Sequence, residues 1–90
     1  MNDKVNIMLV VPEIDKKFHI FLPINKKIGT IIGLLNNALW ELTDGNFPVT
    51  NTAVLYNSET LQVYDFNTLV YKSDIRNGSK LVLLSKNYWM

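Results

Sequence analysis

The sequence contains no cysteine, which excludes disulfide bonds, thiolate metal sites and a cysteine nucleophile. Its single histidine, His19, has no second histidine or cysteine with which to complete a zinc site. The chain also lacks an apolar run of the ~18 residues that a bilayer-spanning helix needs. The apolar stretch at 5–11 is not followed by a small-residue cleavage site. We therefore expect a cytoplasmic protein that is not inserted directly into a membrane.

A strong charge of either sign is missing too, because nine Lys and Arg stand against eight Asp and Glu, for a net charge of +1. The only basic doublets are Lys16-Lys17 and Lys26-Lys27, whereas nucleic-acid binders normally carry a concentrated basic surface. Nucleic acid is not an expected partner. With 90 residues, 48 % apolar and 19 % charged, the composition favours one folded domain over 1–90, with a core at about 5–84 and a short tail at 85–90.

The first half of the chain predicts a β-hairpin followed by a helix. Residues 5–11 and 17–22 alternate with a period of two, and a turn at 12–16 makes the two strands antiparallel. The spacing then changes to about 3.6, with Asn25 as the expected helix N-cap and Gly45 as the expected C-terminal stop. One helical face carries the apolar residues Ile28, Ile31, Ile32, Leu35, Leu39 and Leu42.

Residues outside this apolar face are expected to meet solvent or to fit close packing. Asn36 and Asn37 fall mostly outside the apolar stripe, and so we expect them on the solvent side. Gly29 and Gly33 each cost about 1 kcal/mol relative to Ala inside a helix. We expect that both glycines let the helix lie close to the sheet.

The second half is rich in strand and turn signals. Strands are expected at 54–56 and 80–84, a short strand at 61–63, and a tight turn at Asn77-Gly78. The fold class is therefore α+β, a mixed sheet of four to five strands packed on one α-helix. The known fold with this order of elements is the β-grasp, in which the first and last strands pair in parallel at the centre of the sheet. These two segments are also the most apolar ones.

The spacing of Leu22, Ile28, Ile31 and Leu35, followed by Leu61, Ile75, Leu81 and Leu83, resembles ubiquitin. The segment at 73–81 is similar to the I-x-x-G-D-x-L stretch that precedes the last strand in such domains, with Ser79 in place of the usual Asp. Among bacterial versions the chain is most similar to the YukD/EsaB-like ubiquitin-like proteins. A Leu-Pro at the end of the second strand, at Leu22-Pro23, is shared, and so is termination soon after the last strand without a Gly-Gly pair.

This resemblance implies an accessory protein of a type VII (WXG-type) secretion system in a Gram-positive bacterium, acting by protein–protein contact. The implied partners are a membrane subunit or an FtsK-like ATPase of that machine, with recruitment to the cytoplasmic face of the membrane. Without a terminal diglycine, conjugation to other proteins is not expected. The alternative is a β-grasp signalling or oligomerisation module unrelated to secretion, binding through an edge strand and the basic doublets.

Catalysis is not expected from this sequence. His19 alternates with Phe18 and Ile20 and should point to solvent, and the acidic residues are scattered without a paired-carboxylate motif. No glycine-rich phosphate loop is present. We therefore expect neither an enzyme nor a bound cofactor or metal.

An apolar patch on the sheet face away from the helix is the expected interaction site. If Val54 and Tyr56 point toward the helix, then Leu55 points outward, and so do Val82 and Leu84 on the last strand. Clustered apolar side chains on a surface favour a protein contact or a homodimer. Trp89 is expected beside them, because tryptophan is enriched at interface cores.

Overall fold

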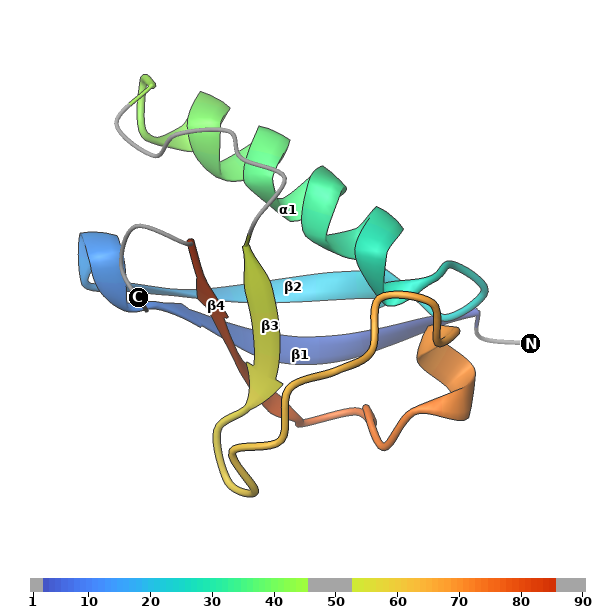
Figure 1. Cartoon of the computed structure of the whole chain (residues 1–90). Coiled ribbons are helices and arrows are strands. Elements are labelled where there is room, and N and C mark those ends of the chain that lie inside the picture. Colours follow the sequence, from blue (N-terminus) through green and yellow to red (C-terminus); the bar gives the residue numbers. More distant parts are fainter. Residues whose placement is uncertain (1–2, 46–52, 86–90) are drawn as a thin grey trace.

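The computed structural model describes residues 3–45 and 53–85. These residues form a four-stranded sheet with one α-helix across one of its faces (Figure 1). The elements are the strands β1 (Lys4–Val11), β2 (Lys16–Pro23), β3 (Val54–Asn57) and β4 (Lys80–Leu84), the helix α1 (Ile28–Leu42), and the short 3-10 turns η1 (Pro12–Ile14) and η2 (Val70–Lys72). The predicted α+β class is confirmed.

The strands lie in the order β2-β1-β4-β3. The central pair β1 and β4 is parallel, with Leu9 beside Leu81, and both outer pairs are antiparallel. This confirms the central parallel pairing expected of a β-grasp. The short strand expected at 61–63 is not a strand but an isolated bridge between Tyr56 and Val63.

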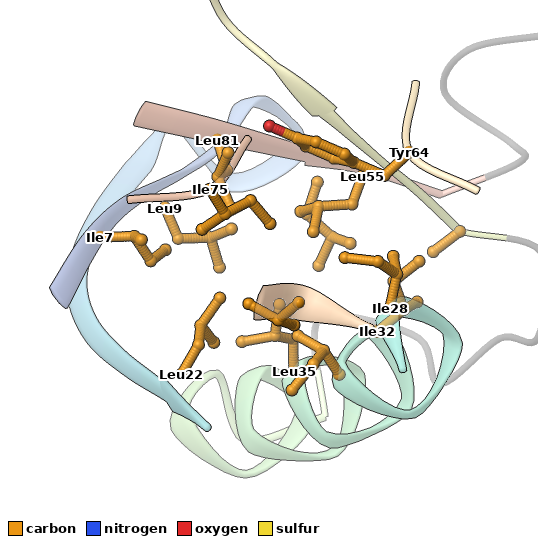
Figure 2. Packing of buried hydrophobic residues seen from close by; sticks show 14 of the residues in the cluster. Ile7, Leu9, Leu22, Ile28, Ile32, Leu35, Leu55, Tyr64, Ile75 and Leu81 are labelled. Carbon is orange, nitrogen blue, oxygen red and sulfur yellow. The ribbon is translucent and has the colours of Figure 1, made fainter. Parts of the chain in front are cut away.

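The core lies between the sheet and α1 (Figure 2). Alternate residues of β1 and β2 point into it, as the period-two pattern predicts. Its fully buried side chains include Ile7, Leu9, Ile28, Ile31, Leu39, Leu55, Leu81 and Leu83. The helical stripe is confirmed except at its end, where Leu42 is 67 % exposed. Asn36, expected on the solvent side, is buried instead.

The start of α1 differs from the prediction. Lys27, not Asn25, occupies the N-cap position, and no side chain caps the helix. Instead, the amides of Ile28 and Gly29 each donate a 2.9 Å hydrogen bond to the carbonyls of Thr68 and Phe66. The loop before η2 therefore satisfies the first helical donors that a side-chain cap would otherwise take.

The two helical glycines have different surroundings, which corrects the expectation that both fit against the sheet. A Cβ on Gly29 would lie 3.3 Å from the Phe66 carbonyl oxygen, so the close neighbour is the loop and not the sheet. A Cβ on Gly33 would meet nothing within 4 Å. The turn glycines behave as predicted, since Gly45 and Gly78 have φ of 83° and 90°.

Candidate interaction surface

The sheet face away from α1 carries the candidate site. The register places Tyr56 opposite Val82 and Val54 opposite Leu84. Since Leu55 and Leu83 point into the core, these four neighbours point to the opposite, open face. Three of them, Val54, Tyr56 and Leu84, line a shallow depression of about 250 Å³ together with Leu61 and Val63 of the following turn, and we name these five residues the open-face patch.

The predicted outward orientation is therefore right on β4 and wrong on β3. Val82 and Leu84 point outward as predicted, although Val82 is only 6 % exposed among its neighbours. Leu55 is fully buried in the core, and it is Val54 and Tyr56 that face outward. The segment 54–56 is apolar at all three positions, so the sequence pattern does not show which of these side chains point toward the core. Trp89 lies outside the described residues.

Two members of the patch come from a segment that the sequence analysis assigned to a strand and not to the site. Leu61 and Val63 are 70 % and 54 % exposed. The backbone bridge from Tyr56 to Val63 brings this turn alongside β3. The turn itself is built by Asn57, whose side-chain oxygen accepts the amides of Glu59 and Thr60 at 2.8 and 3.3 Å.

Leu61 has an unusual backbone for a leucine. Its φ is 63°, in the left-handed region, and its amide donates a 2.8 Å hydrogen bond to the carbonyl of Asn57. Glycine or asparagine adopts this conformation with little strain, whereas a residue with a larger side chain loses roughly 1–2 kcal/mol. Leu61 thus combines backbone strain with an exposed apolar side chain.

A polar network supports the turn from the side. The Tyr64 hydroxyl donates a 2.6 Å hydrogen bond to Asp74 Oδ1 and accepts one of 3.3 Å from Asn57 Nδ2. Burial raises the pKa of Tyr64 to about 12, and the hydrogen bond to Asp74 adds to this rise. The network connects the turn after β3 with the segment before β4, and so fixes the position of Leu61 and Val63 relative to the sheet.

The other candidate groups do not gather into a catalytic arrangement. His19 is exposed on β2, beside Met8 of β1, as predicted. Within residues 3–45 and 53–85, no three His, Asp or Glu side chains are placed to hold a metal ion together. Over the same residues, no helix has the length and apolar character needed to cross a membrane.

A second hollow lies on the opposite side of the molecule. It has a volume of about 490 Å³, and we name it the edge groove, lined by Ile14, Lys16, Phe18, Leu42 and Thr43. It opens between the start of β2 and the end of α1. The sequence analysis assigned Leu42 to the core and did not single out this groove.

Comparison with known proteins identifies the fold as ubiquitin-like. No protein-family model and no curated protein matches the chain. Among solved structures, the ubiquitin-like domain of the Mycobacterium tuberculosis type VII secretion system protein ECCD1 superposes with a TM-score of 0.72 at 14% identity, over 94% of this chain and 100% of that one. The ubiquitin-like domain of an Arabidopsis thaliana protein gives a TM-score of 0.66 at 16% identity, over 94% and 80%.

A chain of the MycP5-free ESX-5 inner membrane complex is similar as well. Its TM-score is 0.68 at 15% identity, and the match covers 92% of this chain but only 21% of that one. The class of protein defined by the fold is therefore a ubiquitin-like domain, and it resembles a domain found in type VII secretion components. At these identities the comparisons define the fold alone.

Proposed function

We propose that this protein is a non-catalytic adaptor of a type VII secretion machine, of the YukD/EsaB-like type from a Gram-positive bacterium. The observation that carries this proposal is the similarity in fold to the ubiquitin-like domain of ECCD1, which matches over that domain's whole length. The sequence resemblance to YukD/EsaB-like proteins at Leu22-Pro23 supports the same assignment, and the turn before β4 resembles that of ubiquitin-like domains in general. The protein acts in the cytoplasm, at the inner face of the membrane.

The open-face patch is the contact surface in this proposal. Its partner is the membrane subunit or the FtsK-like ATPase of the machine, with a homodimer as the competing use of the same surface. Leu61 is the main evidence for this contact surface, because an exposed leucine at φ of 63° stabilises neither the backbone nor the core. A residue that is unfavourable for the isolated fold in two respects is expected where its side chain serves a contact.

The proposed mode of action is contact without chemistry. The four glycines are at 29, 33, 45 and 78, so these 90 residues contain no Gly-Gly pair for activation and conjugation. His19 is exposed on β2, with Met8 as its cross-strand neighbour. Burying the apolar patch against a partner gains roughly 25 cal/mol for each Å² removed from water.

The test uses the purified membrane subunit and FtsK-like ATPase of a type VII secretion machine from the source organism. We expect the cytosolic part of the membrane subunit or the ATPase to bind the wild-type chain in isothermal titration calorimetry. Leu84→Asp should weaken that binding at least tenfold, while Leu42→Glu, on the opposite side of the molecule, should leave it unchanged.

A gene deletion tests the proposed role in secretion. Deletion of the gene should stop export of the WXG-type substrates, and the Leu84→Asp variant should fail to restore it. Normal export in the deletion strain, together with no binding to either component, would contradict the secretion role. If Leu84→Asp instead dissolves a dimer in analytical ultracentrifugation and leaves both associations intact, the patch is a self-contact.

A further inference from the structure

The two edge strands of the sheet differ in how far their outer sides are covered by other parts of the chain. The outer side of β3, which has only four residues, is covered by its own following turn. The Asn57 amide donates to the carbonyl of Gln62, and the Tyr64 amide donates to that of Leu55. The opposite edge, β2, has eight residues and pairs with β1 residue for residue, without a bulge. Among the described residues no strand pairs with its outer side.

Only the end of this edge is protected. Just after β2, the carbonyls of Ile24 and Lys26 accept the amides of Tyr71 and Val70 from η2. The stretch 16–22 has no such cover among the described residues. Proteins usually blunt a long edge strand with a bulge, a proline, lysines or inward charges, because a regular free edge is a template for another strand. β2 has no bulge, and its lysines stand only at its start, at 16 and 17.

The side chains of β2 add an apolar row to this edge. Phe18 and Ile20 point toward the helix side and are only partly buried, and Phe21 on the other face is 67 % exposed. The edge groove begins at Phe18 and extends to Leu42 at the end of α1. In Figure 1 the C-terminal end of α1 stands away from β2, which leaves room there for a side chain from outside.

Charge selects the kind of strand that fits. Lys16 and Lys17 are exposed at the start of β2, and Lys26 and Lys27 are exposed just beyond its end. Those at the start are the only charged residues of the strand itself. Glu13 is engaged with the Ser85 amide at 2.8 Å, and the carboxylates of Asp15, Glu41 and Asp44 lie off the strand, in the turn and at the helix end. An added strand with acidic ends complements both lysine pairs.

A second copy of this chain fits less well. Two β2 strands paired antiparallel about a two-fold axis would place the Lys16-Lys17 end of one copy beside the Lys26-Lys27 end of the other. Like charges at such positions are destabilising. The lysines therefore act against pairing between copies and in favour of an acidic partner.

We propose that the free edge of β2 binds an extended segment of another protein, which adds a fifth strand to the sheet. The segment has apolar residues at alternate positions, one of which enters the edge groove, and acidic residues at its two ends. Main-chain hydrogen bonds to 16–22 hold the segment, and the groove at Leu42 fixes its register. This site is separate from the open-face patch, so one domain joins two partners.

The test uses a fluorescein-labelled synthetic peptide of alternating threonine and isoleucine with aspartates at both ends. Fluorescence anisotropy should show saturable binding that weakens as salt rises. A peptide of the same composition in scrambled order, and one with lysines in place of the aspartates, should bind at least about tenfold more weakly. Amide exchange at 16–22, followed by NMR, should slow when the first peptide is present.

Matched variants locate the site. Leu42→Glu and Leu61→Glu replace leucines of nearly equal exposure, 67 % and 70 %, on opposite sides of the molecule. Leu42→Glu should weaken binding of the first peptide about tenfold or more, and Leu61→Glu should leave that binding unchanged. The double change of Lys16→Glu and Lys17→Glu should do the same as Leu42→Glu, whereas Lys72→Glu with Lys80→Glu should have little effect.

Several results would overturn the proposal. No saturable binding of the first peptide, or slowed exchange confined to the open face, would do so. Equal loss with Leu42→Glu and Leu61→Glu would show that the groove does not select the peptide. A dimer that Leu42→Glu dissociates would assign the edge to a second copy. Because Leu61→Glu alters the open-face patch and Leu42→Glu does not, failure here is distinguishable from failure of the secretion role.

Discussion

The Tyr64 hydroxyl donates a 2.6 Å hydrogen bond to Asp74, and by this contact the turn after β3 is held against the segment before β4. Tyr64→Phe removes the donor and leaves the carboxylate without that partner. A hydrogen bond to a charged group contributes roughly 1.5–3 kcal/mol when buried, and because Asp74 is exposed we expect a loss of about 1 kcal/mol in urea unfolding. Tyr71→Phe, at an exposed tyrosine, is the control and should be neutral. Equal effects of the two changes would contradict the bracing role.

The same tyrosine should make stability depend on alkaline pH. Its pKa is raised from 10.0 to about 12 in the folded protein, so the folded state favours the protonated phenol. This contribution is complete below pH 10 and is lost as the pH rises from 10 toward 12. Ultraviolet absorbance should show a tyrosine that ionises near pH 12, and Tyr64→Phe should remove that step. A step near pH 12 that survives in this variant would belong to another tyrosine.

The helical glycines offer a matched pair of substitutions. Gly33→Ala adds a methyl group in open space and should stabilise the fold by about 0.5–1 kcal/mol, the usual gain inside a helix. Gly29→Ala brings the methyl group to 3.3 Å from a carbonyl that already accepts the Gly29 amide, so the gain should vanish or reverse. Chemical denaturation measures both. An equal gain at the two positions would show that the loop moves away without loss.

Leu61 should separate stability from binding. Leu61→Asn places a residue that tolerates positive φ at a position with φ of 63°, and we expect the midpoint of unfolding to rise by the equivalent of about 0.5–1 kcal/mol. The same variant should bind the proposed secretion partner more weakly, because it removes an apolar side chain that is 70 % exposed. A variant that is more stable and binds equally well would exclude Leu61 from the contact.

Leu55 and Leu84 test the orientation of β3, which differs from the prediction, and that of β4, which agrees with it. Leu55→Ala should destabilise by ~2–5 kcal/mol, since it opens a cavity at a fully buried position. Leu84→Ala, at a partly exposed position on the open face, should cost less than about 1.5 kcal/mol. A loss at Leu55 as small as that at Leu84 in thermal unfolding would instead support the outward orientation of Leu55 that the sequence pattern suggested.

Long, regular patterns were enough to predict the frame of the molecule. The alternation in β1 and β2 and the 3.6-residue spacing in α1 extend over several repeats, so their phase is defined, and the central parallel pair followed from the two most apolar strands. The open-face patch was only half predicted, because β3 is short and apolar throughout. Leu61 was missed because its exposure depends on a left-handed backbone, which the identity of the residue does not indicate.

The cap of α1 and the edge groove were beyond local patterns for a related reason. Both depend on partners distant in sequence: the helix amides bond to Thr68 and Phe66, and the groove joins Leu42 to Phe18. A propensity rule assigns Asn25 to the cap because it considers neighbouring residues only. In the folded molecule a loop forty residues away satisfies the same donors.

The place of β4 between β1 and β3 has a consequence for synthesis on the ribosome. The N-terminal hairpin emerges first, but its inner edge lacks its neighbour until residues 80–84 have left the exit tunnel. Folding of this domain therefore waits for nearly the whole chain, and until then the apolar residues of β1 are open to chaperones. A nascent chain stalled before Lys80 should remain sensitive to protease, whereas one extended by a linker beyond the last residue should become resistant.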